Sequence, residues 1–434
     1  MSLETGFYGL GALLALLVLR VPVALALIAV SFGGIASMIG WTPAFGIVSS
    51  TPYSFVANWT LSAVPMFLLM GFVAFHAGLT GGLFEAAKVL LRRIPGGLAI
   101  ASIFACSGFA AVCGSSLACA AAMGRIAIPE MVRAGYRPSF ACGSIAAGGT
   151  IGALIPPSIL MIVYGVFAET SITKVFVGGI SVGVLTAIGY SAVVLLTCWL
   201  RPDVAPRKPV GDVHMSPAEA VQRVWPVLAL VALVFGGLFS GFFTATEAGA
   251  VGALGAIVIA SVTGRLNRQV VQTSLMETLM TTASLFIIGV GASMFTRFLG
   301  MTGLSGFLTS VVGGADVGYV ELMVVVVLIY LALGMFMEPF GALLVTLPVL
   351  LPVFKAEGIS LVWFGVLVVK LLEIGMITPP VGLNVFVIRN VAGAYASLVQ
   401  IFRGVIPFLL ADLAIVAIIV AVPDLILFLA QWVR

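Results

Sequence analysis

The sequence predicts an all-α polytopic membrane protein made of two inverted-topology repeats, each with a re-entrant helical hairpin and a Pro-Pro-broken transmembrane helix. Hydrophobic residues make up 62% of the 434 residues and charged residues only 8%, whereas a soluble domain carries about 25% charged residues. The 50 glycines and 21 prolines suit helices that are interrupted where the backbone lines a cavity. Related motifs also recur at a fixed spacing in the two halves. The length gives room for roughly ten to thirteen helices.

Composition also argues against several classes of function. The net charge of +4 is small for this length, and no basic patch for nucleic acid is present. The five cysteines form no C-x-x-C pair and lie in apolar runs, so they predict buried residues and no bound metal. A membrane-embedded enzyme needs a cluster of catalytic side chains at membrane depth. With only two histidines, one of them in a polar loop, we predict no catalytic residues and no enzyme.

Apolar and polar runs give the order of elements. Residues 1–200 form the first repeat, 201–223 a polar linker, and 224–434 the inverted second repeat. In the arm that follows the first scaffold helices, Leu83, Ala87, Leu90, Leu91 and Ile94 recur at helical spacing, which predicts an amphipathic helix along the membrane interface. The predicted elements are scaffold helices 1–78, arm 80–95, hairpin 96–134, broken helix 138–168 and helix 174–200, then scaffold helices 224–300, arm 301–318, hairpin 319–357, broken helix 360–393 and helix 396–434.

The distribution of positive charge predicts the orientation. Cytoplasmic segments carry the excess of Lys and Arg. Placing the polar linker in the cytoplasm, with both termini outside, leaves few basic residues on the external side. The basic residues expected outside are Lys174, Arg297, Lys355 and Arg434, and those expected at membrane depth are Arg125 and Lys370. This arrangement requires both hairpins to enter and leave on one side, and it gives the two repeats opposite orientations.

The repeat is visible without gaps. Residues 128–166 align with 351–389 at an offset of 223, and the identities fall on prolines and glycines. They are Pro129 with Pro352, Gly135 with Gly358, Gly152 with Gly375, Pro156 with Pro379, and Pro157 with Pro380. Paired interruptions in two inverted halves are typical of secondary transporters, in which they mark a site near the bilayer midplane.

Each half contains two interruptions that can supply ligands. Small or polar residues predict hairpin tips at Gly114-Ser115-Ser116 and in the segment from Leu333-Gly334 through Met337-Glu338-Pro339 to Gly341. A Pro-Pro pair removes two N–H donors and frees the carbonyls of the preceding turn, which can then ligate a hard cation such as sodium. We therefore predict one sodium site per half, formed by a tip and a break. The predicted ion ligands are Gly114, Ser115, Ser116, Gly152, Ile155 and Pro156 in the first half, and Met337, Glu338, Gly341, Gly375, Thr378 and Pro380 in the second.

The half-helix that restarts after each Pro-Pro pair offers an N-terminus, which attracts a carboxylate. The predicted substrate-binding residues are Ser116, Pro157, Ser158, Pro380, Gly382 and Asn384. Four charged residues also lie at predicted membrane depth, where charge is costly and marks candidate functional groups: Arg125, Glu338, Lys370 and Glu373. Lys370 and Glu373 are three residues apart on one helix face, so we expect them to form an ion pair.

These motifs resemble the large membrane subunit (DctM type) of the tripartite ATP-independent periplasmic (TRAP) transporters. The strings Gly114-Ser115-Ser116, Ile155-Pro156-Pro157-Ser158 and Thr378-Pro379-Pro380-Val-Gly382-Leu-Asn384 carry the resemblance, which covers essentially the whole chain. The resemblance implies a sodium-driven, elevator-type importer of a small organic acid in the bacterial inner membrane. The family's tip and break positions fall here on Ser115, Ser116, Gly152, Pro156, Gly341, Gly375 and Thr378.

The resemblance also implies two partner proteins, a small four-helix membrane subunit (DctQ type) and a periplasmic substrate-binding protein (DctP type). An alternative interpretation is a self-sufficient sodium-coupled carboxylate symporter of similar architecture. Co-purification of a small membrane subunit separates the two interpretations.

Overall fold

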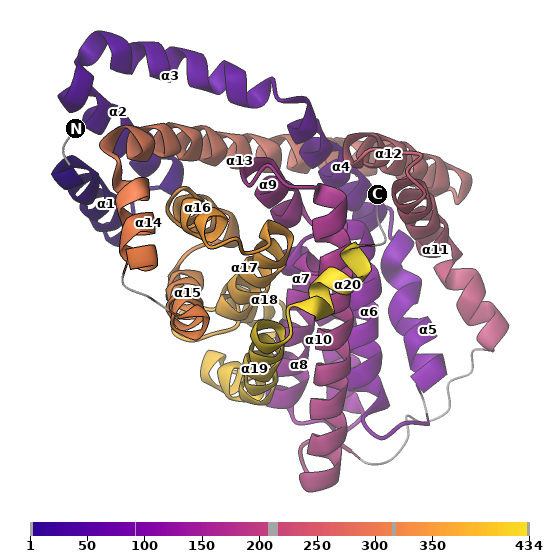
Figure 1. Ribbon diagram of the computed structural model, residues 1–434. Helices are drawn as coiled ribbons and strands as arrows, with labels where there is room; N and C mark the ends of the chain where they lie inside the picture. The colour runs from indigo at the N-terminus through magenta and orange to yellow at the C-terminus, as the bar shows by residue number, and fades with distance from the viewer. Residues whose placement is uncertain (1–2, 92, 207–215, 315–317, 432–434) are drawn as a thin grey trace.

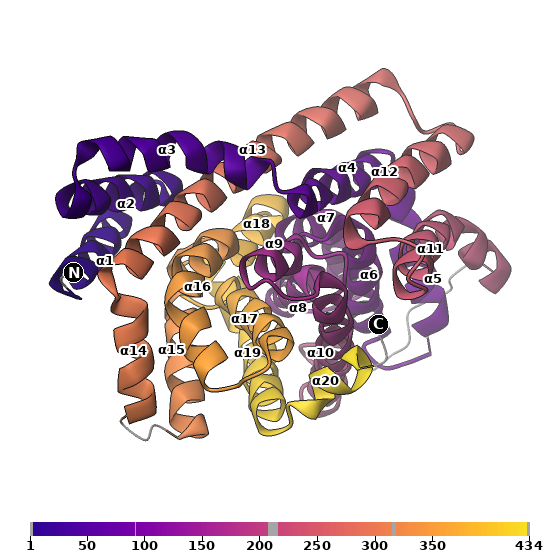
Figure 2. The same ribbon diagram turned by 45° about the horizontal axis from the view of Figure 1, so that its top comes forward.

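The computed structural model describes residues 3–91, 93–206, 216–314 and 318–431. Helices make up almost all of this part of the chain, and no strand occurs in it, so the predicted all-α class is confirmed. Among the described residues, eight helices are long and apolar enough to cross a membrane, and several shorter apolar helices accompany them. Figures 1 and 2 show the arrangement.

The first half contains a group of N-terminal helices, an arm, a hairpin and a broken helix. The boundary between α6 and α7 lies at the predicted tip, and the chain between α8 and α9 contains the first Pro-Pro pair. The bounds are α1 (Leu3–Val18), α2 (Val23–Ile39), α3 (Trp41–Val56), η1 (Trp59–Ser62), α4 (Ala63–His76), η2 (Leu79–Gly81), α5 (Gly82–Leu91), α6 (Gly97–Cys113), α7 (Ser116–Arg133), α8 (Pro138–Thr150), η3 (Ile151–Ala153), α9 (Ile159–Phe167) and α10 (Ile172–Leu200).

The second half repeats this order. The helix α11 begins at Pro217, inside the predicted linker, because Ser216 and Glu219 form a capping box that starts the helix earlier than hydrophobicity alone indicates. The bounds are α11 (Pro217–Phe239), α12 (Ala245–Val262), α13 (Arg268–Thr302), α14 (Leu304–Gly314), α15 (Tyr319–Phe336), α16 (Pro339–Ala356), α17 (Leu361–Gly375), α18 (Leu383–Ala392), α19 (Leu398–Ala421) and α20 (Asp424–Ala430).

Two groups of helices pack around different centres. The helices α2, α3 and α4 pack on the long helix α13, and α12 packs on α4. In both views, α13 crosses one side of the molecule and α3 lies at its outer edge (Figures 1 and 2). The hairpins and broken helices form the other group, in which the halves interpenetrate. Thus α8 of the first half packs on α18 and α19, while α17 of the second half packs on α10.

The arm α5 packs between two neighbouring helices. It contacts both α6 and α11, and it buries Phe84, Ala86 and Val89, whereas the side chain of Leu90 is exposed. Two neighbouring helices thus cover one face of this helix, and its placement along the membrane interface stays a prediction. Lys88 of the arm reaches Glu130 of α7 at 2.8 Å, which ties the arm to the first hairpin.

The orientation can be tested with cysteines at two exposed positions, Pro202 and Glu357. We expect a membrane-impermeant thiol reagent to label Glu357→Cys in intact cells and to label Pro202→Cys only after permeabilisation, because positive charge favours the cytoplasm for the linker. The five native cysteines are all buried and can stay in place as an unreactive background. Labelling of Pro202→Cys in intact cells would contradict the orientation.

Candidate functional site

The two hairpin tips meet at one cavity of about 220 Å³. The first residues of α7 (Ser116, Leu117) and of α16 (Pro339, Phe340) line it, as do Ile159 and Leu160 at the start of α9. The N-terminal group of helices contributes apolar wall residues from α4, and α13 contributes Thr281. The cavity therefore lies where both halves and both groups of helices come together.

Two carboxyl groups face this cavity, and no lysine or arginine of the described residues lines it. Glu338 is the N-cap residue of α16 and is exposed. Glu373, near the end of α17, is buried and accepts a hydrogen bond of 2.6 Å from the Ser116 hydroxyl. A buried charged carboxylate is costly, so a cation placed in this cavity would stabilise that of Glu373.

Tip and break are in contact in the first half. Gly114 has a positive φ of 61°, and a Cβ there would overlap the Pro157 carbonyl oxygen. A Cβ on Gly152 would lie 2.9 Å from the Ser116 Cα and 3.0 Å from the Ser115 carbonyl oxygen. Glycine is thus required at both positions for this close approach. The structure brings together Gly114, Ser115, Ser116 and Gly152, whereas the Ile155 side chain lies next to Gly183 of α10.

The second half has a similar contact, one turn earlier in the hairpin. A Cβ on Gly375 would lie 2.5 Å from the Cα and carbonyl carbon of Gly334 in α15. The Thr378 hydroxyl donates to the Ile374 carbonyl at 2.6 Å and keeps lone pairs for a ligand. Gly341 faces Val23 of α2 instead. Gly334 lies in the segment predicted to form the second tip, but it was not among the predicted ion ligands.

The predicted substrate residues are spread over several places. Ser116 lines the cavity, and Ser158, at the start of α9, caps that helix by accepting from the Met161 amide at 3.4 Å. Asn384 is buried in α18, and its side-chain amide donates to the Ala146 carbonyl of the first half at 3.3 Å. Pro380 is exposed and Gly382 has a positive φ of 61°. Neither Pro380 nor Gly382 is among the described residues that line the cavity.

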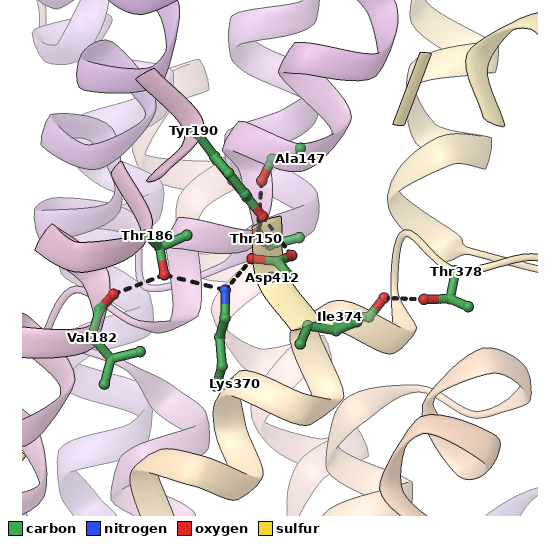
Figure 3. Close-up of polar contacts among 9 residues, drawn as sticks. All are labelled: Ala147, Thr150, Val182, Thr186, Tyr190, Lys370, Ile374, Thr378 and Asp412. Carbon is green, nitrogen blue, oxygen red and sulfur yellow. Dashed lines mark hydrogen bonds and ion pairs between the residues drawn. The ribbon is translucent and has the colours of Figure 1, made fainter. Parts of the chain in front are cut away.

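The expected Lys370–Glu373 ion pair is wrong. The ammonium of Lys370 binds Asp412 of α19 at 2.5 Å and the Thr186 hydroxyl of α10 at 3.1 Å (Figure 3). The second carboxylate oxygen of Asp412 accepts from the Tyr190 hydroxyl at 2.7 Å, and Tyr190 also contacts Thr150 of α8 at 3.1 Å. All these side chains are buried. Lys370 projects away from the cavity because its partner is on another helix.

This buried cluster reflects the repeat. Thr186 and Asp412 each lie 15 residues beyond the serine that caps their helix (171 to 186 and 397 to 412). They therefore occupy equivalent positions of α10 and α19, on either side of Lys370. At the offset of 223, Lys370 corresponds to Ala147 and Glu373 to Thr150. Asp412 was missed because a single acidic residue in an apolar helix gives no motif, although its charge at membrane depth was a usable signal.

Sequence comparisons agree on one family. A family model described as the DctM component of the tripartite ATP-independent periplasmic transporters matches residues 10–425. The chain is 36% identical over 376 residues to the C4-dicarboxylate TRAP transporter large permease protein DctM of Pseudomonas aeruginosa, with 86% of this chain and 87% of that protein covered. It is 30% identical over 437 residues to the 2,3-diketo-L-gulonate TRAP transporter large permease protein YiaN of Escherichia coli, with 98% and 99% covered.

Solved structures of transporters share the fold. The YdaH transporter of Alcanivorax borkumensis superposes with a TM-score of 0.64 at 17% identity, over 88% of this chain and 89% of that chain. MtrF of Neisseria gonorrhoeae superposes with a TM-score of 0.61 at 16% identity, over 90% and 84%. At these identities the likeness concerns the arrangement of helices alone.

Proposed function

The chain belongs to the DctM family of tripartite ATP-independent periplasmic transporters, and from this premise we propose that it imports a small organic acid by sodium symport with an elevator motion. It is a multi-pass permease subunit of the bacterial inner membrane and not an enzyme. The observation that carries the proposal is the cavity between the hairpin tips, because it combines groups for a cation with groups for an anion.

The cation is supported by the two glutamates. Glu338 and Glu373 face the cavity without a lining basic residue, and Lys370, the nearest cation along α17, is already paired with Asp412. Sodium prefers oxygen ligands, and the two tip-and-break contacts supply carbonyl and hydroxyl oxygens beside these carboxylates. We assign one sodium ion to the contact of Ser115 and Ser116 with Gly152, and a second to the contact near Gly375 and Thr378.

The anion is supported by helix N-termini. The first residues of α7, α9 and α16 line the cavity, and the free amides and positive dipole ends of such termini attract carboxylates. Sodium held nearby would offset the repulsion between a substrate carboxylate and the glutamates, so binding of the two would be coupled. Relatives named for C4-dicarboxylate and for 2,3-diketo-L-gulonate fit an acidic substrate.

The elevator motion and the partners follow from the same architecture. The broken helices pack on one another, on the hairpin helices α7 and α15 and on α10 and α19, while α16 and α6 also contact α13 and α4 of the other group. We infer that the first set moves as one body and that α16 and α6 lie where it slides along the other group. The family is tripartite by description, and a relative from Oleidesulfovibrio alaskensis is named DctMQ, of whose length this chain spans 64%. We therefore propose a DctQ-type membrane subunit and a DctP-type binding protein as partners.

Sodium dependence should change when one hydroxyl is removed. We expect Thr378→Val to raise the sodium concentration for half-maximal uptake by about threefold to tenfold, because one ligand oxygen is lost while the side-chain shape is kept. Uptake of a radiolabelled organic acid across a sodium series measures the shift. Thr170→Val, in the loop before α10, is the matched control and should behave as the parent chain does. An unshifted Thr378→Val would place the second sodium site elsewhere.

The requirement for partners is tested in liposomes. The purified chain alone should give no sodium-driven uptake above background, whereas adding the small membrane subunit and the loaded binding protein should restore it for at least one acid of a panel. The panel contains C4-dicarboxylates, sugar acids and sialic acid. Fast sodium-driven uptake by the chain alone would refute this part and favour the self-sufficient symporter.

A further inference from the structure

A second pocket is separate from the cavity between the tips. It has a volume of about 900 Å³ and is lined by the C-terminal end of α10 and the first turns of α8 and α19. Neither hairpin contributes to its lining. The mechanism proposed above makes no use of this pocket.

One end of the pocket is strongly basic. Arg137, Arg201 and Arg403 all line it, one from each of the three chain segments that meet there. Arg137 pairs with Asp203 at 2.7 Å, and both side chains are 59% exposed. Within the described ranges, neither Arg201 nor Arg403 has a carboxylate at ion-pair distance. Guanidinium groups bind phosphate oxygens through paired hydrogen bonds, so two of them are available for an anion.

The other end of the pocket is apolar and open to the side. Leu196 and Leu200 of α10 and Ile406 and Leu410 of α19 line it, and their side chains are 51% to 62% exposed. Trp199, next to this wall, is 71% exposed, and exposed tryptophans are typical of the level of lipid headgroups. The pocket thus places positive charge where two helices meet the aqueous boundary and apolar surface where they continue into the membrane.

We propose that this pocket binds one anionic phospholipid, with its phosphate on Arg201 and Arg403 and an acyl chain along α10 and α19. A soluble anion would leave the apolar wall unused, and a zwitterionic lipid would leave part of the positive charge unbalanced. Basic pockets between membrane helices bind anionic headgroups for these reasons. The bound lipid would join the ends of α8, α10 and α19, which belong to different halves of the chain.

Native mass spectrometry of the purified full-length chain tests the proposal. Phosphatidylglycerol should be retained more strongly than phosphatidylcholine. The double variant Arg201→Gln/Arg403→Gln should retain phosphatidylglycerol about thirtyfold less strongly. Each arginine contributes about 1 kcal/mol to the binding of an anionic lipid, and about 1.4 kcal/mol corresponds to a tenfold change in affinity. Arg268→Gln, which removes an exposed arginine outside the pocket, is the matched control and should retain the lipid. Arg201→Lys/Arg403→Lys should retain more lipid than the glutamine variant but less than the parent, because lysine carries the positive charge but lacks the paired N–H donors of guanidinium.

Two further measurements distinguish a phospholipid from a soluble anion. Leu410→Gln should weaken phosphatidylglycerol retention while all three arginines stay in place, which keeps the test available if the double variant does not fold. Glycerol phosphate at the same concentration should not displace the lipid. Equal retention of phosphatidylcholine, equal retention by the double variant, or displacement by glycerol phosphate would overturn the assignment of a phospholipid site.

Discussion

Gly375→Leu is expected to abolish uptake, and Gly375→Ala to reduce it at least about tenfold. A Cβ on Gly375 would lie 2.5 Å from backbone atoms of Gly334, and backbone cannot rotate away as a side chain can. Even alanine must therefore push α15 from α17, and overpacking of this kind costs about 1–3 kcal/mol. The separation would also open the proposed sodium site beside Thr378. Uptake normalised to the amount of protein in the membrane measures the effect.

The matched control is Gly300 in α13, where a Cβ would meet no atom within 4 Å. Gly300→Ala and Gly300→Leu should keep parental uptake. A thermal-shift assay with and without sodium separates a blocked site from a misfolded chain, because a folded Gly375→Ala should lose the stabilisation that sodium gives to the parent. Parental uptake by Gly375→Ala would show that the close approach of α15 and α17 is not needed.

Breaking the buried ion pair should cause the largest loss of stability. Lys370→Met leaves the Asp412 carboxylate buried without its cation, and Asp412→Asn leaves the ammonium without its anion. Removing one partner of a buried pair costs about 3–5 kcal/mol, so thermal unfolding in detergent should occur at a clearly lower temperature in each single variant. The double variant Lys370→Met/Asp412→Leu should recover most of this loss, because no uncompensated charge is left.

Asp203→Asn provides the comparison with an exposed pair. Asp203 pairs with Arg137 at the surface, where an ion pair contributes about 0–1 kcal/mol to the free energy of unfolding. The unfolding temperature of the Asp203→Asn variant should therefore differ little from that of the parent. If Lys370→Met were no more destabilising than Asp203→Asn, or if the double variant were as unstable as the single ones, the buried pair would not hold α17 and α19 together in the way described.

Local signals predicted the interruptions well. The Pro-Pro pairs interrupt two helices as expected, since two consecutive prolines remove two N–H donors, whereas single prolines such as Pro129 and Pro352 lie within helices. The tip at Gly114 was likewise visible, because a small, polar break separates two apolar runs there, and the structure shows Ser115 as the N-cap of α7. These features depend on neighbours within a few residues, so one sequence is enough to find them.

Partners between distant helices could not be predicted in this way. Lys370 has Glu373 one turn away, yet it pairs with Asp412 on a helix that crosses it, while Glu373 turns to Ser116 of the other half. Spacing along one helix identifies neighbouring side chains that could form an ion pair. Tertiary packing determines whether they pair with each other or with residues of another helix. The face that α5 buries likewise depends on its packing against α11, which lies far away in the sequence.

The cluster around Lys370 makes the two halves electrically unequal. Thr186 and Asp412 occupy equivalent positions, but only one carries charge, and the counterpart of Lys370 is Ala147. If the two inverted halves were identical, each could adopt the conformation of the other. The state open to the outside and the state open to the cytoplasm would then have the same free energy. The Lys370–Asp412 ion pair has no counterpart in the first half, so the two states need not have equal free energies. The inverted symmetry of the backbone is therefore not shared by the charges, and the two halves of this chain are not interchangeable.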